Sequence, residues 1–307
     1  MPARKSKAQA AATAPAAKQP ETPHAAVPFF PFARYTSIVG VHTSLLAFST
    51  LLLPTTPTAL LSKGLAGLQT GDRPRRAVVQ VLTQDPVRTV AWICAGTLLL
   101  QGWWAGWVRK WLHEQRSPTD GADVTKQKLE RQESGNQRNV ALAKSAALTL
   151  AASVALHVVV VLFGAPLTKH LLHTYLMSLL LAILTVFSPA YALGLPSWKS
   201  DSPSLVSWFT WVRLFAELSP RTPVERALVY PAVGAVIGCW AGAIPIGLDW
   251  ERPWQAWPLT PAFGAVGGYI VGSLVALVTS ATFALAQVNR EAQTEQALTE
   301  KTKKCEK

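Results

Sequence analysis

The sequence predicts an all-α polytopic membrane protein with about six transmembrane helices and both termini in the cytoplasm. Half of the 307 residues are hydrophobic and only 15% are charged, and the mean hydropathy is positive. This balance is typical of a chain whose solvent is largely lipid. Each apolar run is long enough to cross a bilayer, which requires about 20 residues per helix. The runs cover residues 36–61, 88–108, 141–163, 171–195, 227–248 and 259–286.

Two of these runs contain prolines that should interrupt their helices. Proline lacks the backbone N–H group, and its ring clashes with the preceding helical turn. Pro54 and Pro57 therefore predict that the first helix ends or kinks near Leu53. Pro189 predicts a kink in the fourth helix, where neighbouring helices must compensate for the lost hydrogen bond.

The distribution of basic residues predicts the orientation of the chain in the membrane. Cytoplasmic segments of membrane proteins carry an excess of Lys and Arg. The two tails and the segments 109–144 and 196–226 together contain 22 of them, whereas the segments on the opposite side contain 7. Both termini are therefore predicted to be cytoplasmic, although the arginine cluster at 73–76 runs against this assignment. Residues 248–258 would then face the lumen or the exterior.

Polar segments surround the six-span domain, which covers residues 34–288. Residues 1–33 are rich in Ala, Pro, Lys and Gln, and their prolines prevent a long helix, which predicts a disordered basic tail. Residues 109–140 mix both charge signs without an apolar face, which predicts a solvated cytoplasmic loop with one short helix. Residues 289–307 form a charged C-terminal tail.

Residues 204–218 carry apolar side chains at helical spacing. The pattern predicts a helix lying in the membrane interface or, alternatively, a re-entrant part of the bundle. Ser202 and Pro203 precede it as start signals, and Pro220 follows it as a stop signal. The apolar positions are Leu205, Trp208, Trp211, Val212, Phe215 and Leu218.

The last two runs each repeat glycine at every fourth position. Residues four apart lie on one face of a helix, so each run presents a stripe where another backbone can approach closely. In lipid, such contact between small residues is a main force that associates helices. The stripes therefore predict helix packing, either with each other or with the helices of a partner. They consist of Gly234, Gly238 and Gly242 in the fifth run, and Gly264, Gly268 and Gly272 in the sixth.

Between these two runs lies the short connection "LDWERPWQAWP", residues 248–258. Tryptophans at a membrane boundary form aromatic belts, because their rings are apolar and their N–H groups prefer water. A belt does not explain the charged residues, and a guanidinium at this level can bind a phosphate or carboxylate through two parallel hydrogen bonds. The mate of Arg252 could be a lipid phosphate, a carboxylate of a partner or Asp249 itself. We therefore expect this loop to contact a partner or a lipid headgroup. The contacting residues would be Asp249, Trp250, Glu251, Arg252, Pro253, Trp254, Gln255 and Trp257.

The sequence offers no catalytic motif. The P-loop, G-x-S-x-G and H-E-x-x-H patterns are missing, and the predicted exterior loops carry too few Asp and His residues for a two-metal site. We therefore expect no catalytic residue, metal or cofactor. The three cysteines suggest neither a disulfide framework nor a metal site, and the basic residues lie in tails and loops, which argues against nucleic acid. His42 and His157 lie inside spans, where each either bonds a neighbouring helix or has a function.

One stretch resembles a known family. Residues 234–258, "GAVIGCWAGAIPIGLDWERPWQAWP", with "GGYIVG" at 267–272 and "SPRTPVERAL" at 219–228, resemble the Pig-F family of GPI-anchor biosynthesis proteins. The DW-x-RPWQ-x-WP pattern is the most specific part, whereas the first 200 residues share mainly the six-span layout. Gly247 departs from the family pattern, which suggests proline there.

The resemblance implies a multi-pass protein of the endoplasmic reticulum membrane that is not itself catalytic. It would stabilise large catalytic subunits that transfer ethanolamine phosphate from phosphatidylethanolamine to mannose of the GPI precursor. Membrane lipids such as phosphatidylethanolamine or the GPI precursor would be further partners. The alternative is a lipid-handling enzyme or transporter that acts alone, with Arg252 and the tryptophans holding a phospholipid headgroup and His42 or His157 lining a path.

Overall fold

The computed structural model describes residues 31–56, 74–116, 124–166, 170–196, 202–248 and 250–305. Within these ranges every regular element is helical, which confirms the predicted all-α class. The predicted N-terminal tail lies outside the described residues except for its last three.

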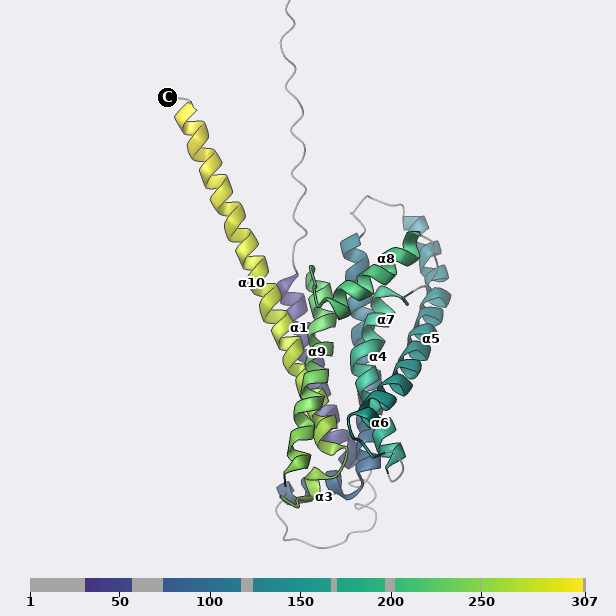
Figure 1. Ribbon diagram of the computed structural model, residues 1–307. Coiled ribbons are helices and arrows are strands. Elements are labelled where there is room, and N and C mark those ends of the chain that lie inside the picture. Colours follow the sequence, from purple (N-terminus) through teal and green to yellow (C-terminus); the bar gives the residue numbers. More distant parts are fainter. Residues whose placement is uncertain are drawn as a thin grey trace, which may run out of the picture. The chain divides into compact units, whose positions relative to one another are not determined.

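Long helices of alternating direction form the bundle (Figure 1). Arg34 near the start of α1 lies 3.7 Å from Glu114 near the end of α4, so these two helices run antiparallel. The start of α1 and the C-terminal part of α10 lie at the same end of the bundle (Figure 1). The bundle helices are α1 (Phe32–Leu52), α4 (Pro86–Arg116), α5 (Val124–Leu162), α6 (Leu171–Ala182), α7 (Ser188–Leu193), α9 (Pro223–Ala243) and α10 (Leu259–Cys305), and the short α3 (Pro74–Gln84) precedes α4.

Five helical segments of the described chain are long and apolar enough to cross a membrane. They are Phe32–Thr55, Gln137–Leu162, Leu171–Leu193, Pro223–Gly247 and Leu259–Lys304. The predicted second span, 88–108, lies within α4, which is not among the five. Helix α4 nevertheless packs against α1, α6 and α7 in the bundle. Its role as a sixth span stays a prediction.

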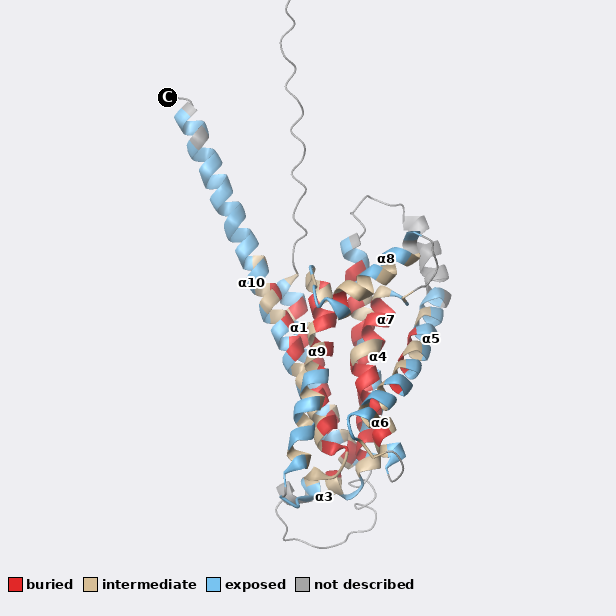
Figure 2. Ribbon diagram, viewed as in Figure 1, coloured by how far each residue is buried: buried red, intermediate tan, exposed pale blue. Residues whose placement is uncertain are grey.

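The core lies around α4 and the helix formed by α6 and α7 (Figure 2). Ile93 of α4 and Leu180 of α6 are fully buried in it. A π-helical turn, η2 (Ile183–Phe187), joins α6 to α7 immediately before Pro189. The kink predicted at this proline stays a prediction. Helix α1 ends at Leu52, as predicted, and continues as a 3-10 turn that contains Pro54.

The polar segment 109–140 differs from its prediction, because most of its described part is helical. Helix α4 continues to Arg116 and α5 begins at Val124, so only residues 117–123 lie outside the described structure. This gap contains Pro118 and Gly121, whereas the segment after it is rich in Lys, Gln and Glu, which are good helix formers. The C-terminal tail is also helical as far as Cys305.

A helix also forms close to the predicted interfacial segment 204–218. Helix α8 (Ser202–Trp211) and the π-helical turn η3 (Val212–Ala216) cross the bundle direction near the end of α7 (Figure 1). The Trp211 indole N–H donates to the carbonyl oxygen of Gly194 at 3.0 Å, and Leu214 is fully buried. Val206 and Phe209 are exposed. The position of this helix in a membrane interface stays a prediction.

Candidate functional site

The two glycine stripes face each other in the structure. Helices α9 and α10 pack antiparallel along their lengths (Figure 1). A Cβ atom built on Gly238 would lie 2.9 Å from the Cα atom of Gly268, and one built on Gly242 would lie 2.9 Å from the Cα atom of Pro261. Real Cβ atoms almost never approach another atom so closely. Glycine is therefore required for this contact, and of the two predicted alternatives the stripes pack against each other.

The two backbones are similarly close at the other glycines of the interface. A Cβ atom on Gly234 would lie 3.2 Å from the Cα atom of Gly272, and one on Gly264 would lie 3.1 Å from the Cα atom of Gly242. Because the obstructing atoms belong to backbone, no side-chain rotation can make room. Helices α9 and α10 thus form one tightly packed pair, and the loop 248–258 connects them at one end.

Gln255 organises this loop from inside. Its side-chain N–H groups donate to the carbonyl oxygens of Pro245 and Leu248, both at 2.7 Å. Its side-chain oxygen accepts a hydrogen bond from the backbone N–H of Arg252 at 2.8 Å. One amide therefore ties the 3-10 turns η4 (Ile244–Gly247) and η5 (Pro253–Gln255) together. The predicted contact residue Gln255 has a structural role within the loop.

Trp257 ties the loop to a third helix. Its indole N–H donates to the hydroxyl oxygen of Thr174 on α6 at 3.1 Å, and Thr174 is fully buried. Trp250 and Trp254 form an edge-to-face pair with ring centroids 5.7 Å apart. Such pairs stabilise by about 0.5–1.5 kcal/mol beyond the area that they bury. The tryptophans therefore differ in role, because Trp257 anchors the loop while Trp250 is 55% exposed.

The outer surface of the loop carries the charged residues. Glu251, Arg252 and Pro253 are exposed, and Glu251 has a positive φ of 47°. Non-glycine residues rarely adopt this left-handed conformation, which often marks a functional turn. Arg252 forms no ion pair with the residues that the structure describes. Asp249 lies outside the described residues.

The arrangement is suited to binding a charged group. An exposed guanidinium beside an exposed indole offers charge-assisted hydrogen bonds and apolar contact to a phosphate or carboxylate that bears an apolar neighbour. Groups of three or more His, Cys, Asp or Glu side chains that could hold a metal ion are not found among the described residues.

At the opposite end of α9, the segment 219–228 forms a helix cap. The Thr222 hydroxyl accepts a hydrogen bond from the N–H of Glu225 at 3.2 Å, and Glu225 accepts one in return from the N–H of Thr222 at 3.2 Å. Glu225 also pairs with Arg213 of η3 at 2.6 Å. This pair joins the segment after α8 to the start of α9. The motif therefore has a structural role.

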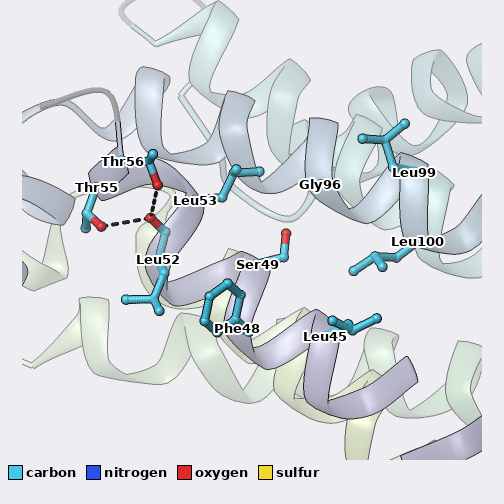
Figure 3. A pocket seen from close by; sticks show the side chains of 10 residues that line it. All are labelled: Leu45, Phe48, Ser49, Leu52, Leu53, Thr55, Thr56, Gly96, Leu99 and Leu100. Atoms are coloured by element: carbon cyan, nitrogen blue, oxygen red, sulfur yellow. Dashed lines mark hydrogen bonds between the residues drawn. The ribbon is translucent and has the colours of Figure 1, made fainter. Parts of the chain in front are cut away.

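An apolar groove of about 570 Å³ lies between the end of α1 and α4 (Figure 3). The hydroxyls of Thr55 and Thr56 at its rim both donate to the carbonyl oxygen of Leu52, at 2.7 and 3.0 Å. These two hydroxyls are thus used within the protein, and the largely apolar lining favours an apolar chain. Phe48 and Leu99 on its walls are largely exposed.

The two histidines predicted inside spans both contact aromatic rings. His42 is fully buried and stacks on Trp104, with ring centroids 4.8 Å apart. His157 lies 6.1 Å from the ring of Tyr175. Sequence reasoning missed Thr174 and Gln101, two buried polar residues with interhelical hydrogen bonds, because their partners lie far away in the chain.

Comparison with known proteins places the chain in a family. Residues 75–277 match the GPI biosynthesis protein family Pig-F, which is more than half of the chain. The chain belongs to the Pig-F family. The match confirms the resemblance, and it includes both glycine stripes and the loop between them. No solved structure matches the chain.

Curated members of the Pig-F family are similar over shorter segments. A protein of Pyricularia oryzae, glycosylphosphatidylinositol anchor biosynthesis protein 11, is 39% identical over 45% of this chain and 48% of its own length. A human protein, GPI ethanolamine phosphate transferase, stabilizing subunit, is 36% identical over 39% and 49%. A Yarrowia lipolytica anchor biosynthesis protein 11 is 30% identical over 66% and 77%. The chain thus spans about half the length of the first two relatives.

Proposed function

We propose that this Pig-F protein is a non-catalytic stabilising subunit of GPI ethanolamine-phosphate transferases in the endoplasmic reticulum membrane. Its catalytic partners would transfer ethanolamine phosphate from phosphatidylethanolamine to mannose of the GPI precursor. Both termini and residues 109–140 would lie in the cytosol, and residues 248–258 in the lumen. Family membership and the name of the human relative support this role.

The exposed outer surface of the 248–258 loop is the main observation that supports the proposal, and it identifies the residues that would make the contact. Gln255 and Trp257 fix the loop, while Trp250 and Arg252 extend outward from it. A fixed frame reduces the entropy lost when these side chains are ordered on binding. We infer that Arg252 binds a carboxylate of the catalytic subunit or the phosphate of a lipid headgroup.

Substitution of Arg252 tests the proposal. Arg252→Ala should reduce ethanolamine-phosphate addition while the level of the chain stays normal, because an exposed loop residue contributes little to folding. The lost hydrogen bond to a charged group corresponds to about 1.5–3 kcal/mol of binding energy. Arg252→Lys should recover only part of the function, because an ammonium keeps the charge but not the two parallel donors. Trp254→Ala should have the same direction of effect.

The assay compares GPI intermediates that lack terminal ethanolamine phosphate with the steady-state levels of this chain and its partner. Arg290→Ala is the matched control, since Arg290 is exposed and lies about 45 Å along α10 from its start at Leu259, at about 1.5 Å per residue. If Arg252→Ala and Trp254→Ala leave the levels of these GPI intermediates normal, the loop serves only as a membrane anchor. Disappearance of the Arg252→Ala chain itself would show that Arg252 is structural and would contradict the proposed contact.

A further inference from the structure

A group of polar side chains meets in the middle of the bundle. The Ser188 hydroxyl of α7 donates to the side-chain oxygen of Gln101 on α4 at 2.5 Å, and the Tyr269 hydroxyl of α10 donates to the same oxygen at 3.3 Å. None of the three residues is more than 2% exposed. Gln101 stands at the midpoint of α4, so these bonds lie far from both ends of the helix. Three helices are therefore joined through one amide oxygen.

Two aromatic side chains extend this group to α1. His42 of α1 is fully buried, stacks on Trp104 at an interplanar angle of 11° and meets the ring of Tyr269 edge-on at 5.9 Å. Trp104 follows Gln101 by three positions on α4, which places both on one face of that helix. Together these five side chains, which we call the central polar cluster, bring α1, α4, α7 and α10 into contact.

Four polar atoms of the central polar cluster have no hydrogen-bond partner among the residues that the structure describes. They are both ring nitrogens of His42, the side-chain nitrogen of Gln101 and the indole nitrogen of Trp104. Exchanging the nitrogen and oxygen of the Gln101 side-chain amide would not remove the problem, because the oxygen would then be the atom without a partner. Buried polar groups are almost always hydrogen-bonded, and lipid offers no substitute partner. Four such atoms on three adjacent side chains indicate a shared ligand.

We propose that the central polar cluster binds internal water that bridges His42, Gln101 and Trp104. The unpartnered atoms are mainly donors, since the amide nitrogen carries two N–H groups, the indole one and the imidazole one, while the second imidazole nitrogen accepts. Water both accepts and donates hydrogen bonds, so it can serve the N–H donors and the one accepting nitrogen of this set.

The surroundings exclude larger ligands. His42 and Gln101 are 0% exposed and Trp104 is 1% exposed, so neither a lipid headgroup nor a partner side chain reaches them. A transition metal requires several deprotonated ligands, and His42 is the single imidazole of the cluster. The bound water would complete the contacts of α1 with α4 and would be part of the packed structure.

Hydroxyl-radical footprinting by X-ray radiolysis tests this proposal on the full chain in lipid nanodiscs. Radicals form from water at its site, so a buried side chain beside bound water is oxidised in spite of its burial. Trp104 should be oxidised severalfold faster than Met177, a readily oxidised side chain that is 1% exposed within the apolar core. Fragment ions must separate Trp104 from its neighbour Trp103, which is 45% exposed.

Two variants remove the partners of the water while keeping shape. Gln101→Met keeps the length of the side chain, and His42→Phe keeps a ring that can stack on Trp104. Each should lower the oxidation of Trp104 toward the rate of Met177. Thr149→Val is the control, because the Thr149 hydroxyl is buried but already donates to the carbonyl oxygen of Ser145 at 2.7 Å.

Oxidation of wild-type Trp104 as slow as that of Met177 would overturn the proposal. Fast oxidation that persists unchanged in both variants would also overturn it, because the water would then be held elsewhere. If the variants fail to fold, the wild-type comparison between Trp104 and Met177 decides alone.

Discussion

Adding one methyl group at Gly268 should separate the two closest helices of the bundle. In Gly268→Ala the new Cβ atom would lie 2.9 Å from the Cα atom of Gly238 and 2.9 Å from the carbonyl carbon of Gly234. Ordinary van der Waals contact begins at 3.4 Å, and the carbonyl oxygen of Gly234 would lie closer still than these two atoms, so the backbones must move apart by more than about half an ångström. Overpacking of this kind typically costs about 1–3 kcal/mol.

Gly267 provides a matched control on the same helix. A Cβ atom there would meet nothing within 4 Å, so Gly267→Ala makes the same chemical change without a clash. Alanine also favours a helix over glycine by about 1 kcal/mol, which makes Gly267→Ala neutral or stabilising. The difference between the two variants therefore isolates the contact between α9 and α10.

Thermal unfolding of the purified variants in detergent measures this difference. Gly268→Ala should unfold several degrees below Gly267→Ala, and less partner should copurify with it. Gly268→Leu should be worse still, and worse than Leu285→Ala, since Leu285 is 70% exposed. Equal unfolding temperatures for the two alanine variants, with equal partner yield, would refute the reasoning that backbone contact holds these helices.

Three further outcomes are expected. Glycosylation acceptor sites should be modified when inserted beside Trp254 but not within 109–140, and modification of the latter would reverse the topology. Gln255→Ala should increase proteolytic cleavage of the loop, because three hydrogen bonds are lost; an unchanged cleavage rate would show that the amide does not hold it. Thr222→Ala should lower the free energy of unfolding by about 1 kcal/mol, because the helix cap is lost. Glu225→Ala should lower it by more, because the ion pair with Arg213 is lost as well. Chemical denaturation would measure both variants, and equal losses would count against a contribution of the ion pair.

The glycine contact could be anticipated because its cause is local. Spacing by four residues places Gly234 and Gly238 on one face whatever they meet, and close backbone approach demands glycine in every case. The partner could not be chosen from the sequence, since a second helix of this chain and a helix of another protein make the same demand. Only the position of Gly268 opposite them in space decides it.

The loop was predicted as a unit, but the roles of its residues were not. Gln255 turns inward because the carbonyl oxygens of Pro245 and Leu248 lie where its amide reaches both. Trp257 bonds Thr174, which is 83 positions away in the chain. Such partners depend on tertiary structure, whereas the contact role of Trp250 and Arg252, which have exposed side chains, stays a prediction.

The prediction of a loop for residues 109–140 was wrong because the flanking helices were not considered. These residues show no apolar face, and an isolated polar helix of this length would be only marginally stable in water. Nucleation is the costly step, however, and the membrane helices on both sides provide it. Helices α4 and α5 can therefore extend into solvent as far as the first Pro and Gly residues of the connection allow.

The length of α10 makes its far end a sensitive indicator of the glycine contact. Its 47 residues form a continuous rod of about 70 Å at about 1.5 Å per residue, and its exposed C-terminal part extends away from the bundle (Figure 2). A tilt of about 10° where the helix leaves the bundle would move an end roughly 30 Å away by about 5 Å. A spectroscopic probe attached near Cys305 would therefore report, at a distance, small changes in how α10 rests on α9.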